Sequence, residues 1–208
     1  METTILPTTD SQAIQAALLV LQAGGLVAFP TDTVYGLAAD PFNPAAIEHL
    51  YAAKERNMSK AIAVLIGTMK QLPQITPGFS EQAEALAARF WPGALTLVVS
   101  RRAELPAQLS VLPTIGVRMP DHPFALNLLQ ASGPLATTSA NQSGAGNPLT
   151  AADVLDQLGG RIELVLDGGT CPGGVPSTVV DCTVPDVRVL REGAISAEDI
   201  RAVLGKNL

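Results

Sequence analysis

Short apolar runs alternate along the chain with stretches of helical periodicity, and this alternation restricts the possible folds more than any other feature of the sequence. Residues 26–29, LVAF, are bounded by glycine and proline, which is typical of a buried strand. Between Ile14 and Leu21 the apolar residues follow the i, i+3, i+4, i+7 spacing of an amphipathic helix. This helix is predicted to begin at Asp10 or Ser11, where a polar side chain can cap it.

The same criteria predict the remaining elements. Further helices are expected after the caps Asn43, Ser80, Thr150 and Ser196, and near residues 123–131. Further strands are expected at residues 61–66, 94–100, 114–119, 134–139, 162–166, 177–182 and 187–191. Helices interleaved with strands predict a single α/β domain around one mixed sheet, over residues 1–208 with its core at 11–205. The last two strands are joined by a short loop and should form an antiparallel edge.

Composition excludes several classes of protein. Apolar residues make up 47% of the 208 residues and charged residues 15%, against roughly 25% in an average soluble domain, so the chain can bury a sizeable core and is not disordered. Cys171 and Cys182 cannot form a disulfide framework and are interpreted as free thiols. No apolar run approaches the ~18 residues of a membrane span, and the N-terminus does not resemble a secretion signal. A cytoplasmic location without membrane contact is therefore expected.

Charge is unevenly distributed along the chain. The net charge is −6, yet residues 51–118 hold eight bases and four acids, while residues 1–50 hold five acids and no lysine or arginine. Such a chain lacks the overall excess of basic residues that is typical of proteins that coat nucleic acid. A basic middle suits a protein that holds a small anion in one place; a chance excess of bases in this window is the alternative.

Polar residues without an evident folding role follow several of the predicted strands. Residues 30–36 (PTDTVYG) and residues 139–147 (SANQSGAGN) each come directly after a strand, and the glycine-rich stretch 167–178 surrounds a Ser-Thr pair. Loops at strand ends are where α/β sheets bind ligands, and glycines let a ligand approach the backbone. An ordinary Asp/Thr turn at 30–36 and a mobile surface loop at 167–178 are the structural alternatives.

Three cations lie close together where the second predicted helix ends. Lys54 follows Ile47 by seven residues, near the apolar face of this helix, and Arg56 and Lys60 come next. Because two residues span ~200° on a helix, Lys54 and Arg56 can share a cleft only if the helix ends between them. We expect both at a cleft rather than in the core, where the cations would suit a polyphosphate. A solvated helix C-terminus is the alternative.

Arg118 is the only charged residue in the strand-like segment 114–119. An arginine in such a place has a carboxylate or phosphate partner. The partner is either a bound anion or a local acid such as Asp121.

Several catalytic motifs are missing from the sequence. It contains no GxxxxGK[ST], no GxSxG and no HExxH, and its two histidines, His49 and His122, are interpreted as structural. A P-loop ATPase, a serine hydrolase and a zinc enzyme are therefore disfavoured. An enzyme with these residues would act by positioning and charge stabilisation, as in phosphoryl and nucleotidyl transfer.

Taken together, the chain resembles the YrdC-like family across nearly all of residues 15–195. The segments that carry the resemblance are, in order, FPTDTVYGLAAD, AAKERNMSKAIAVLI, FWPGALTLVV, TIGVRMPDHP, PLATTSANQSG, VPSTVVD and VLREGAI. The resemblance implies a single α/β domain with a twisted sheet and a large open cleft. It also implies synthesis of threonylcarbamoyl-AMP and pyrophosphate from L-threonine, bicarbonate or CO2, and ATP. That reaction is the first step in forming N6-threonylcarbamoyladenosine at position 37 of tRNA.

The resemblance also implies roles for individual residues. The family's K-x-R and S-x-N signature falls on four residues that would be catalytic: Lys54, Arg56, Ser139 and Asn141. The implied L-threonine contacts are Thr33, Arg118, Ser139 and Ser177. The implied ATP contacts are Arg56, Lys60, Thr114, Asn141 and Arg191. No metal ligand is implied within the protein, and Mg2+ would accompany ATP.

The chain departs from the family pattern at two places. Pro176 stands where the family has an acidic residue, and residues 147–150 (NPLT), with Leu149, replace its Ser-Pro-Thr. In length the chain resembles the short members, which lack the C-terminal domain of longer ones. The implied partners are the small-molecule substrates and, transiently, the downstream tRNA threonylcarbamoyl transferase complex, with little or no direct binding of tRNA. A YciO-type paralogue and an RNA-binding module are the alternatives.

Overall fold

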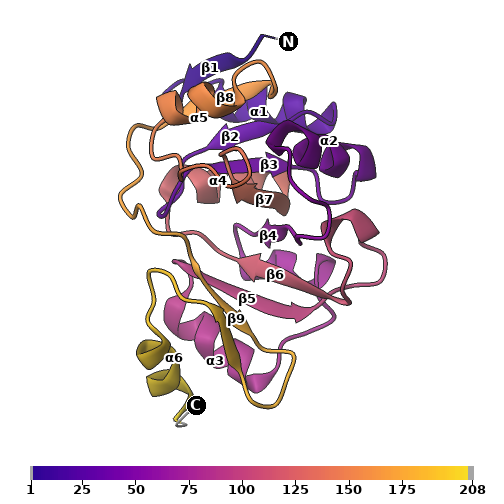
Figure 1. Ribbon diagram of the computed structural model, residues 1–208, viewed down its shortest axis with the longest axis vertical. Coiled ribbons are helices and arrows are strands. Elements are labelled where there is room, and N and C mark those ends of the chain that lie inside the picture. Colours follow the sequence, from indigo (N-terminus) through magenta and orange to yellow (C-terminus); the bar gives the residue numbers. More distant parts are fainter. Residues whose placement is uncertain (1, 206–208) are drawn as a thin grey trace.

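The protein folds around one long mixed β-sheet. The computed structural model describes residues 2–205, so the first residue and the last three of the predicted domain lie outside the described range. Within that range, ten strands form a single sheet in the order β1-β8-β2-β3-β7-β4-β6-β5-β9-β10. The sheet runs along the molecule, and the two termini lie at opposite ends of it (Figure 1). The strands are Thr4–Pro7 (β1), Val27–Phe29 (β2), Gly36–Ala39 (β3), Ala63–Leu65 (β4), Leu95–Ser100 (β5), Thr114–Arg118 (β6), Leu135–Ser139 (β7), Leu164–Asp167 (β8), Thr178–Asp181 (β9) and Arg188–Arg191 (β10).

Helices cover both faces of the sheet, and each face has its own apolar core. The helices are Ala13–Gln22 (α1), Pro44–Lys54 (α2), Glu81–Phe90 (α3), Pro123–Ser132 (α4), Ala151–Leu158 (α5) and Ala197–Leu204 (α6). Helices α1 and α4 pack against one face, on Phe29 and Leu65 among others. Helices α2, α3, α5 and α6 pack against the other, on Val64 and Val117 among others. Val64 and Leu65 separate in this way because neighbouring strand residues point to opposite faces.

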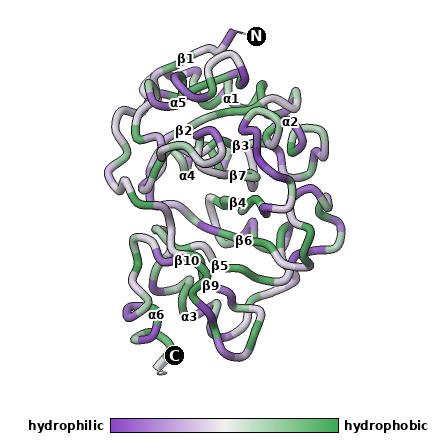
Figure 2. The backbone as a smooth tube through the Cα atoms, in the orientation of Figure 1, coloured by the Kyte–Doolittle hydropathy of each residue, from purple (hydrophilic) through white to green (hydrophobic). Residues whose placement is uncertain are grey.

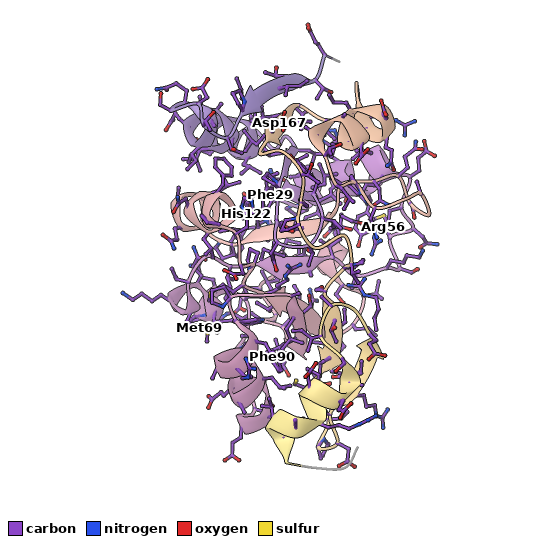
Figure 3. The ribbon with its side chains drawn as sticks, turned by 90° about the vertical axis from the view of Figure 1, so that its left-hand side faces the viewer. Phe29, Arg56, Met69, Phe90, His122 and Asp167 are labelled. Carbon is purple, nitrogen blue, oxygen red and sulfur yellow. The ribbon has the colours of Figure 1, made fainter. Side chains whose placement is uncertain are left out.

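The hydropathy of the chain follows this layered arrangement. Hydrophobic residues lie along the central strands β4, β5 and β6, and hydrophilic residues gather at loops and on the outer sides of helices (Figure 2). In the side view, Phe29 lies in the interior, whereas Met69 and Arg56 lie on opposite flanks (Figure 3). Phe29 is fully buried and Met69 is half exposed. In residues 2–205, none of the helices is both long enough and apolar enough to cross a membrane.

The predicted helix caps are confirmed. The Asn43 side chain accepts hydrogen bonds from the first turn of α2, and the Ser80 hydroxyl caps α3. Thr150 with Asp153 and Ser196 with Asp199 form the two reciprocal capping boxes of α5 and α6. The antiparallel edge formed by β9 and β10 is confirmed as well.

Several boundaries differ from the sequence prediction. Helix α1 begins at Ala13 rather than at Asp10 or Ser11, because the Asp10 carboxylate accepts a hydrogen bond from the Gln12 amide in a turn before the helix. Strands β1 and β3 were not predicted. β3 is GLAA, which has no β-branched or aromatic residue to indicate a strand, and β1 lies outside the predicted core and ends in proline. Two short 3-10 helices, Met69–Gln74 (η1) and Ala107–Leu109 (η2), were also missed.

Part of one sheet face is left open between these layers. In the described residues, the core beneath α1 and α4 includes side chains from β2, β3, β4, β7 and β8 but none from β5, β6 or β9. In the part of the chain that the structure describes, the face of β5, β6 and β9 on that side therefore lies outside this core and is left open.

Candidate functional site

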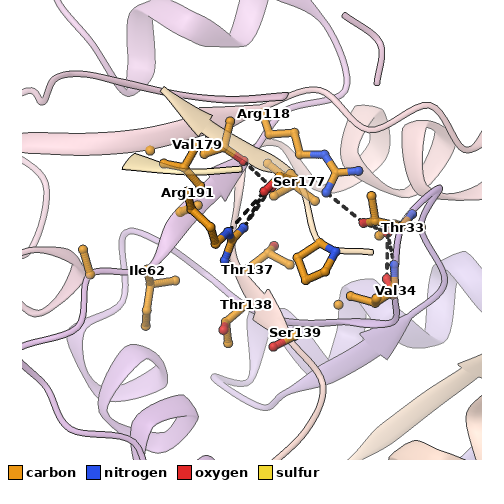
Figure 4. Close-up of a pocket in the computed structure, with 18 of the residues that line it drawn as sticks. Thr33, Val34, Ile62, Arg118, Thr137, Thr138, Ser139, Ser177, Val179 and Arg191 are labelled. Carbon is orange, nitrogen blue, oxygen red and sulfur yellow. Dashed lines mark hydrogen bonds between the residues drawn. The ribbon is translucent and has the colours of Figure 1, made fainter. Parts of the chain in front are cut away.

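A cavity of about 310 Å3 occupies the open part of the sheet face (Figure 4). Its floor is formed by neighbouring strands: Val98 of β5 pairs with Gly116 of β6, and Thr96 of β5 pairs with Val179 of β9. Gly116 places no side chain on this floor. A methyl group at Gly116 would lie only 3.0 Å from Thr96 Cγ2.

Arg118, at the end of β6, is held by three protein groups. Nε donates to the carbonyl of Gly93 at 2.9 Å, Nη1 to Thr33 Oγ1 at 3.0 Å, and Nη2 to Asp32 Oδ1 at 2.5 Å. The acid that pairs with Arg118 is therefore Asp32, not Asp121. Burial lowers the pKa of Arg118, and the carboxylate of Asp32 opposes that shift. A guanidinium has five N–H groups, so one on each Nη is left to bind an anion.

Ser177 lies across the floor from Thr33 and is fixed from two sides. Its hydroxyl is 2.8 Å from Thr96 Oγ1. Arg191 Nη2 donates to the Ser177 carbonyl at 2.7 Å and to its hydroxyl at 3.3 Å, as Figure 4 shows. Burial lowers the pKa of Arg191. Ser177, near the end of the glycine-rich stretch 167–178, is therefore anchored to Thr96 of β5 and Arg191 of β10.

Helix α2 separates Lys54 from Arg56 by ending between them. Lys54 is its last residue, and Glu55 adopts a left-handed conformation with φ 51°. The condition set by the sequence, that the helix must end between these cations, is met. Arg56 lines the cavity, and its Nη2 donates to the carbonyl of Ala61 at 3.0 Å.

Lys54 does not lie at the cleft surface as expected. Its side chain points into the protein and only 1% of the residue is exposed. Nζ donates to the carbonyls of Ser139 and Asn141 and, at 3.4 Å, to Asn141 Oδ1. Burial, with a smaller contribution from Arg56, lowers the pKa of Lys54 to about 7. The ammonium thus shapes the wall of the cavity from behind.

Ser139 and Asn141 form a local unit at the end of β7. The Ser139 hydroxyl donates to Asn141 Oδ1 at 2.5 Å, and the Asn141 amide donates to the carbonyl of Ala145 at 2.8 Å. Ser139 lines the cavity, whereas Asn141 is buried behind it. Lys54, Ser139 and Asn141 are therefore coupled through hydrogen bonds.

The structure brings most of the sequence-predicted site residues together. Those that line the cavity are Thr33, Arg56, Arg118, Ser139, Ser177 and Arg191. Lys54 and Asn141 support its wall. Lys60 and Thr114 are not among the lining residues, and Thr114 pairs with Ser100 at the far end of β6. Pro176, one departure from the family pattern, lies on the cavity wall.

Sequence reasoning gave no individual role to several residues of the site. Thr31 and Tyr35 of the stretch 30–36 line the cavity, as do Thr96, Thr137 and Thr138, and Asp32 fixes Arg118. The position of Thr96 could have been predicted from the sequence. Thr96 lies two residues before Val98 in a strand, so its hydroxyl is on the same face of the sheet as the Val98 side chain. The pairing of Asp32 with Arg118 could not have been predicted from the sequence, since 86 positions separate the two residues.

The cavity is strongly cationic. Three guanidinium groups, those of Arg56, Arg118 and Arg191, reach it, and Asp32 is already paired with one of them. Within residues 2–205, no group of three or more His, Cys, Asp or Glu side chains is placed to hold a metal ion. The arrangement can bind a carboxylate and a phosphate chain close together.

Comparison with known proteins identifies the family. Residues 19–193 match the family Sua5_yciO_yrdC, whose description is telomere recombination. The threonylcarbamoyl-AMP synthase of Bacillus subtilis is 44% identical over 96% of this chain, and a putative one of Mycobacterium tuberculosis is 40% identical over 96%. The chain spans 58% of the former and 92% of the latter.

Solved structures agree with this assignment. Sua5 of P. abyssi complexed with L-threonine matches with a TM-score of 0.94 and 38% identity, over 98% of this chain and 61% of that one. YciO of E. coli matches with a TM-score of 0.85 and 25% identity, over 95% and 99%. The fold, the matched residues 19–193 and these identities together show that the chain belongs to the Sua5/YciO/YrdC family.

Proposed function

We propose that the protein is a nucleotidyltransferase that makes L-threonylcarbamoyl-AMP and pyrophosphate from L-threonine, CO2 or bicarbonate, and ATP. One observation carries the proposal: a single cavity presents three guanidinium groups together with the hydroxyls of Thr33 and Ser177. Relatives of the same family that bear the synthase name support it, as does the threonine complex of Sua5.

The chemistry explains why cations dominate the site. The amine of threonine takes up CO2 and loses a proton to form a carbamate. A carbamate oxygen then attacks the α-phosphorus of ATP, and the bond to pyrophosphate breaks. Because an anion approaches an anion, fixed positive charge around the phosphates lowers the barrier. Holding both reactants in one cavity supplies a further part of the rate.

Each side chain has a role in this proposal. The free Nη hydrogens of Arg118 bind the threonine carboxylate as a fork, and Thr33 and Ser177 bind the substrate's other polar groups. Arg56 and Arg191 neutralise the phosphates of ATP. Lys54 and Asn141 keep Ser139 in place. Lys60 and Thr114 would contact ATP only where it extends beyond the cavity.

The wider setting is also part of the proposal. Mg2+ would arrive bound to the phosphates of ATP, which fits a cavity that has no Asp or Glu among its described lining residues. The product would pass to the tRNA threonylcarbamoyl transferase complex, and the reaction would take place in the cytoplasm.

Pyrophosphate release from ATP tests the proposal, with threonine and bicarbonate omitted in turn. Release should require both. ATP turnover that ignores threonine would contradict the proposal and favour a YciO-type protein of different chemistry. Purified tRNA added alone should leave the rate unchanged.

Arg118→Lys adds a test of the carboxylate fork. Lysine keeps the charge opposite Asp32 but cannot form two parallel hydrogen bonds. We expect kcat/KM for threonine to fall by about tenfold or more, the loss of a charge-assisted hydrogen bond. Arg188→Lys is the matched control, because Arg188 is exposed on β10 and outside the cavity. Equal kcat/KM values for the two variants would show that Arg118 does not bind threonine.

A further inference from the structure

Tyr35 occupies an unusual place between three loops of the cavity. These are residues 30–35, which carry Thr33 (the Thr33 loop), residues 139–148 (the Ser139 loop) and residues 168–177 (the Ser177 loop). The residue is fully buried at the junction of the loops. Neither the sequence motifs nor the proposed chemistry give it a task.

Every polar group of Tyr35 is used to connect loops. Its backbone N–H donates to the carbonyl of Pro148 at 3.0 Å, and its carbonyl accepts from the amide of Ala140 at 2.8 Å. Its hydroxyl donates to the carbonyl of Gly169 at 2.8 Å and accepts from the amide of Gly168 at 3.1 Å. The backbone thus ties the Thr33 loop to both ends of the Ser139 loop, and the side chain ties it to the start of the Ser177 loop.

The Ser177 loop is held at several points, and the hydroxyl of Tyr35 fixes its start. Further along, the amide of Cys171 donates to the carbonyl of Leu149 at 2.8 Å, and the Cys171 side chain is buried. The far end of the loop is held by Arg191 and Thr96. Between the two ends it lies over the Thr33 loop: the amide of Gly174 donates to the carbonyl of Thr33 at 2.9 Å. A methyl group at Gly173 would lie 2.5 Å from the carbonyl oxygen of Asp32, so the two loops are in close contact.

We propose that Tyr35 is a positioning residue whose hydroxyl sets the spacing between Thr33 and Ser177. It touches no reacting atom. It acts through the two loops whose hydroxyls, on the proposed function, bind L-threonine. Burial raises the pKa of Tyr35 to about 12, so the hydroxyl keeps its proton at every pH at which the protein would work.

Tyr35→Phe tests the inference, because it keeps the buried ring and removes only the oxygen. Amide hydrogen exchange should become faster in residues 168–176, while exchange in the rest of the chain stays unchanged. On the proposed function, the KM for L-threonine should rise about three- to tenfold, which is the worth of one to two hydrogen bonds, with the KM for ATP unchanged.

Tyr51→Phe is the matched control, since it removes the hydroxyl of the other buried tyrosine. That hydroxyl donates to the carbonyl of Lys60 at 2.8 Å, on the loop that follows Arg56. Faster exchange should therefore move to residues 56–61, and both the exchange of residues 168–176 and the KM for L-threonine should match the unsubstituted protein.

The outcomes separate a positioning role from a merely structural one. Faster exchange throughout the chain together with an unchanged KM for L-threonine would overturn the inference, as would unchanged exchange in residues 168–176. If the unsubstituted protein releases no pyrophosphate, the proposed function fails. In that case the exchange data and L-threonine binding measured by calorimetry still decide whether Tyr35 spaces the loops.

Discussion

At the scale of single residues, the burial of Lys54 has the largest consequences. Its ammonium satisfies two main-chain carbonyls and one amide oxygen of the Ser139 loop. A buried acceptor left without a donor costs about 1–3 kcal/mol. Lys54 therefore contributes to the fold and to the shape of the cavity at once, which a lysine at a cleft surface would not do.

Alanine at Lys54 and at Arg56 should thus have different effects. Lys54→Ala should lower the free energy of unfolding by about 2 kcal/mol or more and the melting temperature by roughly 4–8 °C, and it should abolish turnover. Arg56→Ala should abolish turnover with little change in melting temperature, because Arg56 is only partly buried and bonds main-chain carbonyls at the loop surface. Thermal melts of both variants measure the difference. Equal melting temperatures would mean that Lys54 is not structural.

The lowered pKa of Lys54 predicts opposite pH trends for stability and activity. In the unfolded chain Lys54 titrates near 10.5 and in the folded protein near 7, so between these values the unfolded state binds more protons. By linkage, this residue makes stability rise with pH from about 7 to about 10.5. Activity should fall as the pH rises through about 7, because the Lys54 amine then loses its charge and one of its three N–H donors to the Ser139 loop.

Comparison with Lys54→Met isolates this contribution. The variant should lack the part of the pH dependence that Lys54 causes, as measured by urea unfolding between pH 6 and 10. The comparison between the two proteins is needed because Cys182 makes stability fall with rising pH. Burial raises the pKa of Cys182 to about 12, so unfolding releases its proton at alkaline pH. A variant with the same pH dependence as the unsubstituted protein would contradict the assignment.

At the scale of elements, the site depends on a glycine at position 116 of β6. Gly116→Ala places a methyl group on the cavity floor, 3.0 Å from Thr96 Cγ2, and so pushes on the side chain that holds Ser177. Overpacking of this kind costs about 1–3 kcal/mol. We expect a severalfold lower kcat/KM for threonine. Gly78→Ala is the control, because nothing lies within 4 Å of its added methyl group and both activity and melting temperature should be retained.

Helices and strands were predictable from the sequence where the residue composition or the capping residues indicated the type of element that the structure contains. Helix α5 had both a capping box and an apolar stripe, and β5 (LTLVVS) had β-branched residues. Strand β3 had neither: alanine and glycine fill it because the chain needs room there, with an added methyl at Gly36 only 2.9 Å from Thr137 Cγ2. Its pairing with β7 supplies the stability that its own propensity lacks.

The candidate site was predictable only in part, for a physical reason. Local patterns located Thr33, Arg118 and Ser177, since polar residues at strand ends stand out against an apolar background. The separation of Arg56 from Lys54 depended on one left-handed residue, Glu55, and the partner of Arg118 came from a distant loop. Both are properties of tertiary packing, which periodicity does not encode.

At the scale of the whole molecule, the net charge of −6 and the concentration of cations in one cavity predict weak binding of tRNA. Dissociation constants should exceed the ~10⁻⁴–10⁻⁶ M typical of non-specific nucleic-acid binding at physiological salt. Fluorescence anisotropy with labelled tRNA measures this. Micromolar, salt-dependent binding by the protein alone would instead favour an RNA-binding module.

The lining of the cavity spans the chain from Thr31 to Arg191, in strands whose order in the sheet is far from their order in sequence. On a ribosome, Arg191 emerges only after the other residues that line the cavity. Ligands stabilise only a state that can bind them. Substrates can therefore give no help to a growing chain that has not yet reached Arg191, and their protection against unfolding begins only when all the strands of the cavity are present.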